Sequence, residues 1–146
     1  MTPTDVLAIY GALLATALGV WDVAKHAFER RRLRVTCYIA NLYTPGVGVT
    51  VRNRIAYSIA NTGGKPIVVT TLGGALRNGH NFMFLPEDVR LPFTLQPGES
   101  VVVPGPMPED INEVKHFLVH DALGKGWQGS TKIVKKQLQA RVEKSA

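Results

Sequence analysis

Sixteen consecutive residues near the start of the chain carry no charge, and they restrict the fold more than any other feature of the sequence. They occupy positions 6–21, between Asp5 and Asp22, and only Tyr10 and Thr16 among them carry a hydroxyl group. A helix that is apolar on every side belongs in a protein core or in a lipid bilayer. A helix lying flat on a membrane surface needs one strongly polar side, which this stretch lacks.

The length of the uncharged stretch is compatible with a membrane span. At about 1.5 Å per residue it covers about 24 Å, whereas the hydrocarbon layer is about 30 Å thick. Flanking residues can extend the helix into the headgroup region, and the amphipathic ring of Trp21 favours the membrane interface. We therefore predict a transmembrane helix, with a helix packed in a soluble core as the alternative. A cleaved signal peptide is disfavoured because the opening MTPTD has no basic residue.

Basic residues follow the uncharged stretch and none precedes it. Lys25 and the four arginines Arg30, Arg31, Arg32 and Arg34 come after it. Because positive charge stays on the cytoplasmic side, we predict a single-pass protein of the inner membrane with its N-terminus outside and its domain in the cytoplasm. The four arginines lie close enough to the bilayer to contact anionic lipid headgroups. The alternative is that they only set the topology.

Three small residues recur every four positions in the uncharged stretch. Gly11, Ala15 and Gly19 therefore lie along one stripe of a helix. Small residues at this spacing let two membrane helices approach closely, so the stripe predicts a homodimer or a contact with a partner's helix. Alternatively, the stripe only reflects the ordinary composition of membrane helices.

From residue 33 the pattern changes from helix to short strands that end at Gly, Pro, Asn or Asp. The expected strands are 33–43, 54–61, 66–77, 81–85, 89–95, 100–104, 116–122 and 126–134. Strands this short and this closely spaced, with no helix-length segment between most of them, predict a mainly β fold, an antiparallel sandwich. A helical turn can form within 107–116. The predicted organisation is a membrane helix with a basic extension (1–34), a β-sandwich (35–131) and a basic tail, either a short helix or frayed (132–146).

The net charge of +6 is confined to the two flanks of the chain. Residues 35–131 carry seven bases and seven acids, so the predicted domain is neutral. A nucleic-acid-binding domain would carry a basic patch on its folded body, so we predict no nucleic-acid partner. In the tail, Lys135, Lys136 and Arg141 are predicted to return to the membrane or to bind an acidic partner.

Three segments carry a resemblance to known proteins. They are YSIANTGGKPIVVTTLGG (57–74), LQPGES (95–100) and FLVHDALGKGW (117–127). In this respect the chain resembles uncharacterised bacterial single-pass membrane proteins with an immunoglobulin-like β-sandwich, over residues 4–132 or so. The resemblance implies that fold and no particular activity. The chain departs from antibody-type domains, which have a cysteine pair, because Cys37 is its only cysteine.

The remaining motifs predict no catalytic, metal or cofactor site. NTGGKP (61–66) differs from a phosphate-binding loop, because Pro66 stands where a helix would start; its glycines are expected to take positive φ in a turn. His116 and His120 on one strand would lie about 13 Å apart, too far to share a metal. Cys37 is predicted to be a small core residue. We predict a protein without enzymatic activity.

The sequence thus predicts a membrane-anchored β-sandwich that binds or scaffolds a protein partner, still unknown, at the inner membrane surface. The partner could reach loops or add a strand to a sheet edge. The alternative is a soluble or secreted structural component, such as a virion or envelope protein, with its N-terminal helix packed in an assembly.

Overall fold

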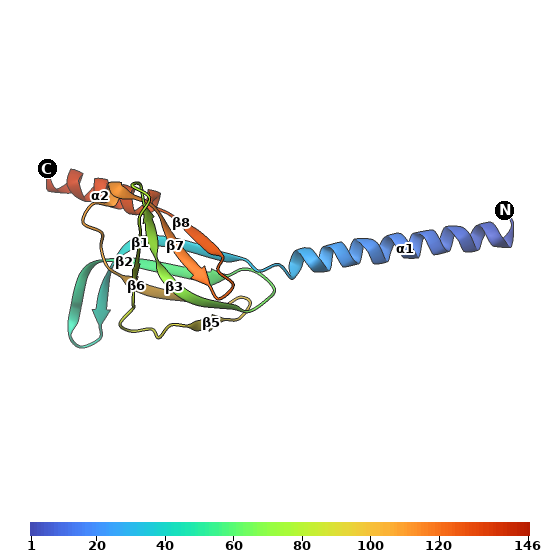
Figure 1. Cartoon of the computed structure of the whole chain (residues 1–146), viewed down its shortest axis with the longest axis horizontal. Coiled ribbons are helices and arrows are strands. Elements are labelled where there is room, and N and C mark those ends of the chain that lie inside the picture. The colour runs from blue at the N-terminus through green and yellow to red at the C-terminus, as the bar shows by residue number, and fades with distance from the viewer.

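The structure, a computed structural model, describes the backbone of residues 1–146 and the side chains of all but residues 49 and 50. A long helix, α1 (Pro3–Phe28), leads into a group of strands, and a second helix, α2 (Lys132–Ser145), ends the chain (Figure 1). The strands are β1 (Leu33–Thr44), β2 (Gly48–Asn61), β3 (Ile67–Leu76), β4 (Asn81–Phe84), β5 (Phe93–Leu95), β6 (Ser100–Gly105), β7 (Val114–Asp121) and β8 (Gly126–Ser130). A short 3₁₀ helix (Ile111–Glu113) precedes β7, within the predicted helical turn.

Helix α1 begins at a well-formed cap and extends away from the strands. The Thr2 hydroxyl accepts a hydrogen bond from the Asp5 N–H and the Asp5 carboxylate accepts one from the Thr2 N–H, which satisfies donors that the first turn leaves open. Its 26 residues make it about 39 Å long at about 1.5 Å per residue. None of residues 3–28 is buried, and Figure 1 shows the helix projecting alone. The predicted helix is confirmed, and it is not packed into the protein's own core.

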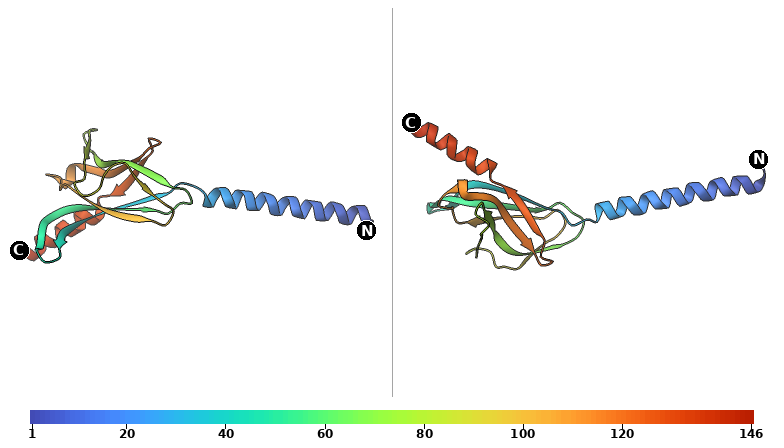
Figure 2. Two further views of the ribbon diagram at one scale, coloured as in Figure 1. Left: turned by 90° about the horizontal axis from the view of Figure 1, so that it is seen from below. Right: turned by 45° about the horizontal axis from the view of Figure 1, so that its top comes forward.

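All strands belong to one sheet of eight strands. Its order is β4-β3-β7-β8-β1-β2-β6, and β5 pairs with the part of β3 that β4 leaves free. The sheet curls into a half-barrel with the core inside, which the two views of Figure 2 show. Every pairing is antiparallel except that of β1 with β8, where Val35 and Thr36 face Gly129 and Ser130 in parallel register.

The predicted strand content is confirmed, whereas the predicted arrangement differs in two respects. The strands form one curled sheet in place of two facing sheets, and the β1–β8 pair makes the sheet mixed. The reason is that alternation along a strand identifies its buried face and gives no information about its neighbour in the sheet. Strand β2 also starts six residues earlier than expected, at Gly48, because it pairs with β1 up to the connecting turn. Residues 132–134, expected in the last strand, belong to α2.

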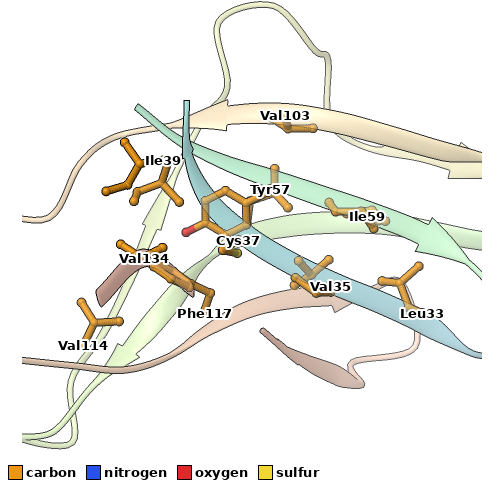
Figure 3. Close-up of a cluster of buried hydrophobic side chains, with 14 of the residues drawn as sticks. Leu33, Val35, Cys37, Ile39, Tyr57, Ile59, Val103, Val114, Phe117 and Val134 are labelled. Atoms are coloured by element: carbon orange, nitrogen blue, oxygen red, sulfur yellow. The ribbon is translucent and has the colours of Figure 1, made fainter. Parts of the chain in front are cut away.

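The core is built from alternating side chains of the strands (Figure 3). Along β1, every second residue from Leu33 to Ile39 is buried. Tyr57 of β2 lies at the centre, with its ring centroid 5.2 Å from that of Phe84 and 5.4 Å from that of Phe117. Its hydroxyl donates a 3.0 Å hydrogen bond to the Gly73 carbonyl of β3. The curl of the sheet brings β2 and β3 to opposite sides of one aromatic cluster.

Helix α2 completes the side of the barrel that β8 leaves open. Because β8 pairs with only two residues of β1, the later part of β1 has no strand on that side. There Gln137 takes the place of a strand: the Ile39 N–H donates to its Oε1 at 2.7 Å, and its Nε2 donates to the Ile39 carbonyl at 3.4 Å. Val134 is fully buried against the core. A helical tail was predicted, and the structure shows that its first turns are docked.

Candidate functional site at the junction of helix and barrel

The segment between α1 and β1 lies against the β2–β3 turn and is hydrogen-bonded to it. The Thr62 N–H donates to the Arg32 carbonyl at 2.9 Å, and the Gly64 N–H donates to the Arg30 carbonyl at 3.2 Å. Only residues 29–32 separate the end of the helix from the start of β1. Since two of these four residues are tied through their backbones, the helix and barrel are joined without a free linker.

Two glycines make this close contact possible. A Cβ atom on Gly63 would lie 2.5 Å from the Arg32 nitrogen, and one on Gly64 would lie 2.5 Å from the Phe28 carbonyl oxygen, closer than any real side chain approaches. Neither glycine has a positive φ, so the expectation that they supply positive φ was wrong. They are needed because backbone packs directly on backbone here.

A buried amide holds the β2–β3 turn in shape. Asn61 is 1% exposed, and its Nδ2 donates to the Lys65 carbonyl at 2.8 Å and to the Leu95 carbonyl at 2.9 Å. Its Oδ1 accepts from the Gly63 N–H at 3.1 Å. This role could not be predicted from the sequence, because asparagine at the end of a strand is also common as an exposed turn residue.

Beside the junction lies a cavity of about 460 Å³. The last turn of α1, the junction segment, the β2–β3 turn and the β7–β8 hairpin all contribute to it. Its lining residues are His26, Glu29, Arg30, Arg31, Lys65, Asp121, Leu123, Lys125 and Trp127. We refer to it as the junction cavity. It brings together basic residues that are far apart in the sequence.

One acidic residue in the junction cavity is fully occupied by hydrogen bonds. The Asp121 carboxylate accepts from the backbone N–H groups of Leu123 at 2.9 Å and Lys125 at 3.0 Å, and from the Trp127 indole N–H at 3.2 Å. Burial alone would raise the pKa of Asp121, but these hydrogen bonds and the nearby Arg31 charge outweigh it, so its pKa lies below the usual range. Asp121 is therefore ionised and acts as the organising residue of the hairpin.

The other charges of the junction cavity are near its rim. The Lys125 ammonium lies 4.1 Å from the centroid of the Trp127 ring, a cation–π contact. Glu29 has Lys65 at 3.9 Å and Lys25 at 4.0 Å, all three side chains being well exposed. No other ion pair forms among the side chains that the structure describes.

Neither protein-family models nor curated proteins match this chain. Its function is therefore argued from its own residues.

The structure divides the four predicted membrane-interface arginines. Arg30 and Arg31 line the junction cavity, and Arg32 is exposed at the start of β1. Arg34 points outward from β1, since its neighbours Leu33 and Val35 are buried. Two of the four arginines thus join Lys65 and Lys125, which the sequence analysis did not single out. The only feature of the sequence that marks Lys65 and Lys125 is that each lysine stands next to glycine in a turn.

The predicted interface and helix-packing residues of α1 are all exposed. Trp21 is 71% exposed and lies seven residues before the end of the helix. Gly11, Ala15 and Gly19 are exposed as well, and a Cβ atom on either glycine would meet nothing within 4 Å. The stripe therefore has no partner within the chain.

The basic residues of the tail lie far from the junction cavity. Helix α2, with Lys135, Lys136 and Arg141, is at the end of the barrel opposite α1 (Figure 1). The Arg141 guanidinium donates to the Asn53 side-chain oxygen on β2. Lys135 lines a separate groove between α2 and the short 3₁₀ helix.

No metal centre forms among the residues that the structure describes: three or more His, Cys, Asp or Glu side chains nowhere converge. Cys37 is fully buried in the core, as predicted, and burial raises its thiol pKa to about 12. His116 and His120 lie four positions apart on the same strand, β7, as expected.

Proposed function

We propose that this chain is a membrane-anchored β-module: α1 spans a bilayer, and the half-barrel binds or scaffolds a protein partner at the inner membrane surface. Helix α1 is long and apolar enough to cross a membrane. The chain is proposed to be non-catalytic. The assignment of the half-barrel to the immunoglobulin-like class, suggested by its sequence segments, stays a prediction.

One observation carries the proposal: the apolar side chains of α1 have no partner within the molecule. Leu7, Leu13 and Leu18 are each at least 64% exposed, although the rest of the chain buries a continuous core. Exposed apolar surface costs about 25 cal/mol per Å² in water. A helix with so much of it requires lipid or another protein around it.

The arginines at the end of α1 support the orientation. Positive charge clusters directly after the apolar segment, so the positive-inside rule favours a cytoplasmic half-barrel. In that orientation α2 and the β1–β2 hairpin extend into the cytoplasm, away from the bilayer (Figure 1). Exposed Tyr43 and Val47 at the hairpin, the outer edge of β6 and the α2 bases are the surfaces offered to a partner.

Membrane extraction tests the anchor. We expect the full chain to remain in the membrane pellet after alkaline carbonate treatment and to dissolve with detergent. Recovery in the soluble fraction, or in large detergent-free particles, would instead support a structural component whose α1 helices pack together in an assembly. That alternative explains the bare helix equally well, and this experiment separates the two.

A topology assay tests the orientation. Replacing Arg30, Arg31, Arg32 and Arg34 with glutamate should invert or abolish insertion, because the positive charge that retains the domain in the cytoplasm becomes negative. A reporter fused to the C-terminus measures this. Replacing Lys132, Lys135, Lys136 and Arg141 is the matched control and should leave the topology unchanged. Unaltered topology of the arginine variant would contradict the proposed orientation.

A further inference from the structure

We propose that the junction cavity binds the phosphate group of an anionic phospholipid in the membrane that holds α1. The proposal rests on the proposed function, because it needs α1 in a bilayer. The direct ligands are inferred to be the side chains of Arg30, Lys65 and Lys125 at the rim. The cavity would select anionic lipids from the surrounding membrane.

The first argument is the separate origin of the basic residues. Arg30 and Arg31 follow α1, but Lys65 belongs to the β2–β3 turn and Lys125 to the β7–β8 hairpin. A topology signal needs bases only close to the membrane helix in sequence. A topology signal therefore does not explain why two turns that are distant in sequence bring lysines to the same cavity. A binding site for an anion explains this convergence of lysines.

The second argument is the balance of charge. The cavity has four permanent cations and two acids. Asp121 is occupied by three N–H donors, and Glu29 pairs with Lys65 at 3.9 Å and Lys25 at 4.0 Å. Arg30 and Lys125 have no ion-pair partner among the described side chains, whereas the Arg31 charge is near the Asp121 carboxylate and helps to lower its pKa. Guanidinium and ammonium groups without a carboxylate partner can donate charge-assisted hydrogen bonds to phosphate oxygens.

The third argument is the depth of the cavity relative to the proposed membrane. From Trp21, placed at the edge of the hydrocarbon, the helix rises about 8 Å to His26 at about 1.5 Å per residue. The headgroup layer on each side of a bilayer is about 5–8 Å thick. His26 lines the cavity, which therefore begins at the outer limit of the headgroup layer, where long basic side chains can extend back toward the lipid phosphates.

The hairpin beside the cavity is also suited to a lipid surface. Leu123 at its tip is 70% exposed, and Trp127 places its ring under the Lys125 ammonium. An exposed leucine next to a tryptophan and a lysine is a combination favoured at membrane interfaces. Free phosphate shares the chemistry of the headgroup but has no reason to require this apolar neighbour.

Trp127 provides a direct probe. The full chain with Trp21→Phe has Trp127 as its only tryptophan. Reconstituted into phosphatidylcholine nanodiscs with an increasing fraction of phosphatidylglycerol, it should show a saturating change in Trp127 emission. In a Lys65→Ala/Lys125→Ala variant, normalised to its own signal in pure phosphatidylcholine, the half-maximal fraction should rise about tenfold or saturation should be lost. A Lys65→Arg/Lys125→Arg variant should retain the response.

Control variants separate a site from general attraction. Lys115→Ala/Lys132→Ala removes the same charge at the other end of the barrel and should leave the response unchanged. An equal loss in this control, or no response to phosphatidylglycerol, would overturn the proposal. A lysine-dependent response to inorganic phosphate in phosphatidylcholine nanodiscs would overturn the assignment to lipid.

Two further measurements keep the proposals distinct. Protection of the buried Cys37 from a thiol reagent shows that each variant is folded. Carbonate extraction of the same variants reports membrane insertion separately. A chain that is inserted and folded but insensitive to anionic lipid refutes the lipid site alone, whereas a chain that is never inserted refutes the proposed function.

Discussion

Single buried polar groups decide the local structure at the junction, and Asn61 is the clearest case. Its amide uses both Nδ2 hydrogens and its Oδ1, on three different backbone groups. An aspartate has the same shape but no hydrogen to donate. It would place a carboxylate against two carbonyl oxygens inside the protein. The identity of one terminal atom therefore controls the turn that supports α1.

We expect Asn61→Asp to lower the free energy of unfolding by about 3 kcal/mol, because two buried carbonyls lose their donor and face a charge. Urea denaturation of the full chain in detergent measures this. Asn78→Asp is the matched control: Asn78 is exposed, and its Oδ1 accepts one backbone N–H, which a carboxylate can also do. A change of less than about 0.5 kcal/mol is expected there. Similar losses in both variants would refute the role assigned to Asn61.

Burial of Cys37 makes the stability of the barrel dependent on alkaline pH. The folded thiol has a pKa of about 12, against an ordinary value of 9.0. Between these values the unfolded chain loses a proton that the folded chain keeps, so stability falls as pH rises. From pH 8 to pH 10 the thiol should account for a loss of about 1 kcal/mol in the free energy of unfolding. Urea denaturation of the wild type and Cys37→Ala at both pH values checks this, and an equal decline in the two proteins would contradict it.

At the scale of the elements, alternation along the chain predicts strands well but not their neighbours. Every second residue of β1 from Leu33 to Ile39 is apolar and buried, and burial alternates in the same way along β7 from Phe117 to Asp121, whereas β3 buries four consecutive residues, 72–75. The parallel β1–β8 pair and the Gln137 bridge depend on where the last strand ends, which is decided by long-range packing. The glycines of the β2–β3 turn were recognised, but their contact with the junction segment was not. A close approach of two backbone segments leaves no periodic pattern in the sequence.

The contact between α1's end and the β2–β3 turn should be sensitive to a single methyl group. In Gly63→Ala the new Cβ would collide with the Arg30 carbonyl and the Arg32 nitrogen, so the two segments must separate. We expect faster hydrogen exchange at the Thr62 and Gly64 amides and a loss of about 1–3 kcal/mol in stability.

Gly126→Ala is the control for this change. A Cβ there would meet only His120 and Leu118 side chains, at 3.4 Å or more, and Gly126 has no positive φ. Exchange at Thr62 and Gly64 should stay at the wild-type rate. Unchanged exchange in Gly63→Ala as well would show that the junction is not held by this contact.

At the scale of the whole molecule, α1 and α2 lie at opposite ends of the half-barrel (Figure 1). Residues 35–131 are neutral as a whole, so a charge count along the sequence does not single out Lys65 and Lys125 within them. In the folded chain these two lysines nevertheless lie beside Arg30 and Arg31 of the first basic flank. The sequence predicted the long apolar helix and a mainly β body. It could not predict the junction cavity, because three segments far apart in the sequence build it.

The position of α1 and α2 at opposite ends of the half-barrel can be tested by measuring how accessible each end is to lipid. Because Cys37 is buried, a fluorophore can be attached to Leu123→Cys or to Ser145→Cys without removing the native thiol. In nanodiscs with headgroup quenchers, we expect strong quenching at position 123 and little at position 145, which lies at the far end of α2. Equal quenching at both positions would be incompatible with α2 lying away from the membrane.

The hydrogen-bonded junction has a mechanical consequence. Only four residues separate the end of α1 from β1, and backbone contacts restrain them. Once α1 lies in a bilayer, a thinner or thicker membrane changes the inclination of such a helix. A stiff coupling passes that inclination to the barrel as a whole, and the displacement is largest at the end opposite α1, where α2 and the β1–β2 hairpin lie (Figure 1). The angle at which the far end of the barrel is presented would then vary with the thickness of the lipid sheet around the anchor.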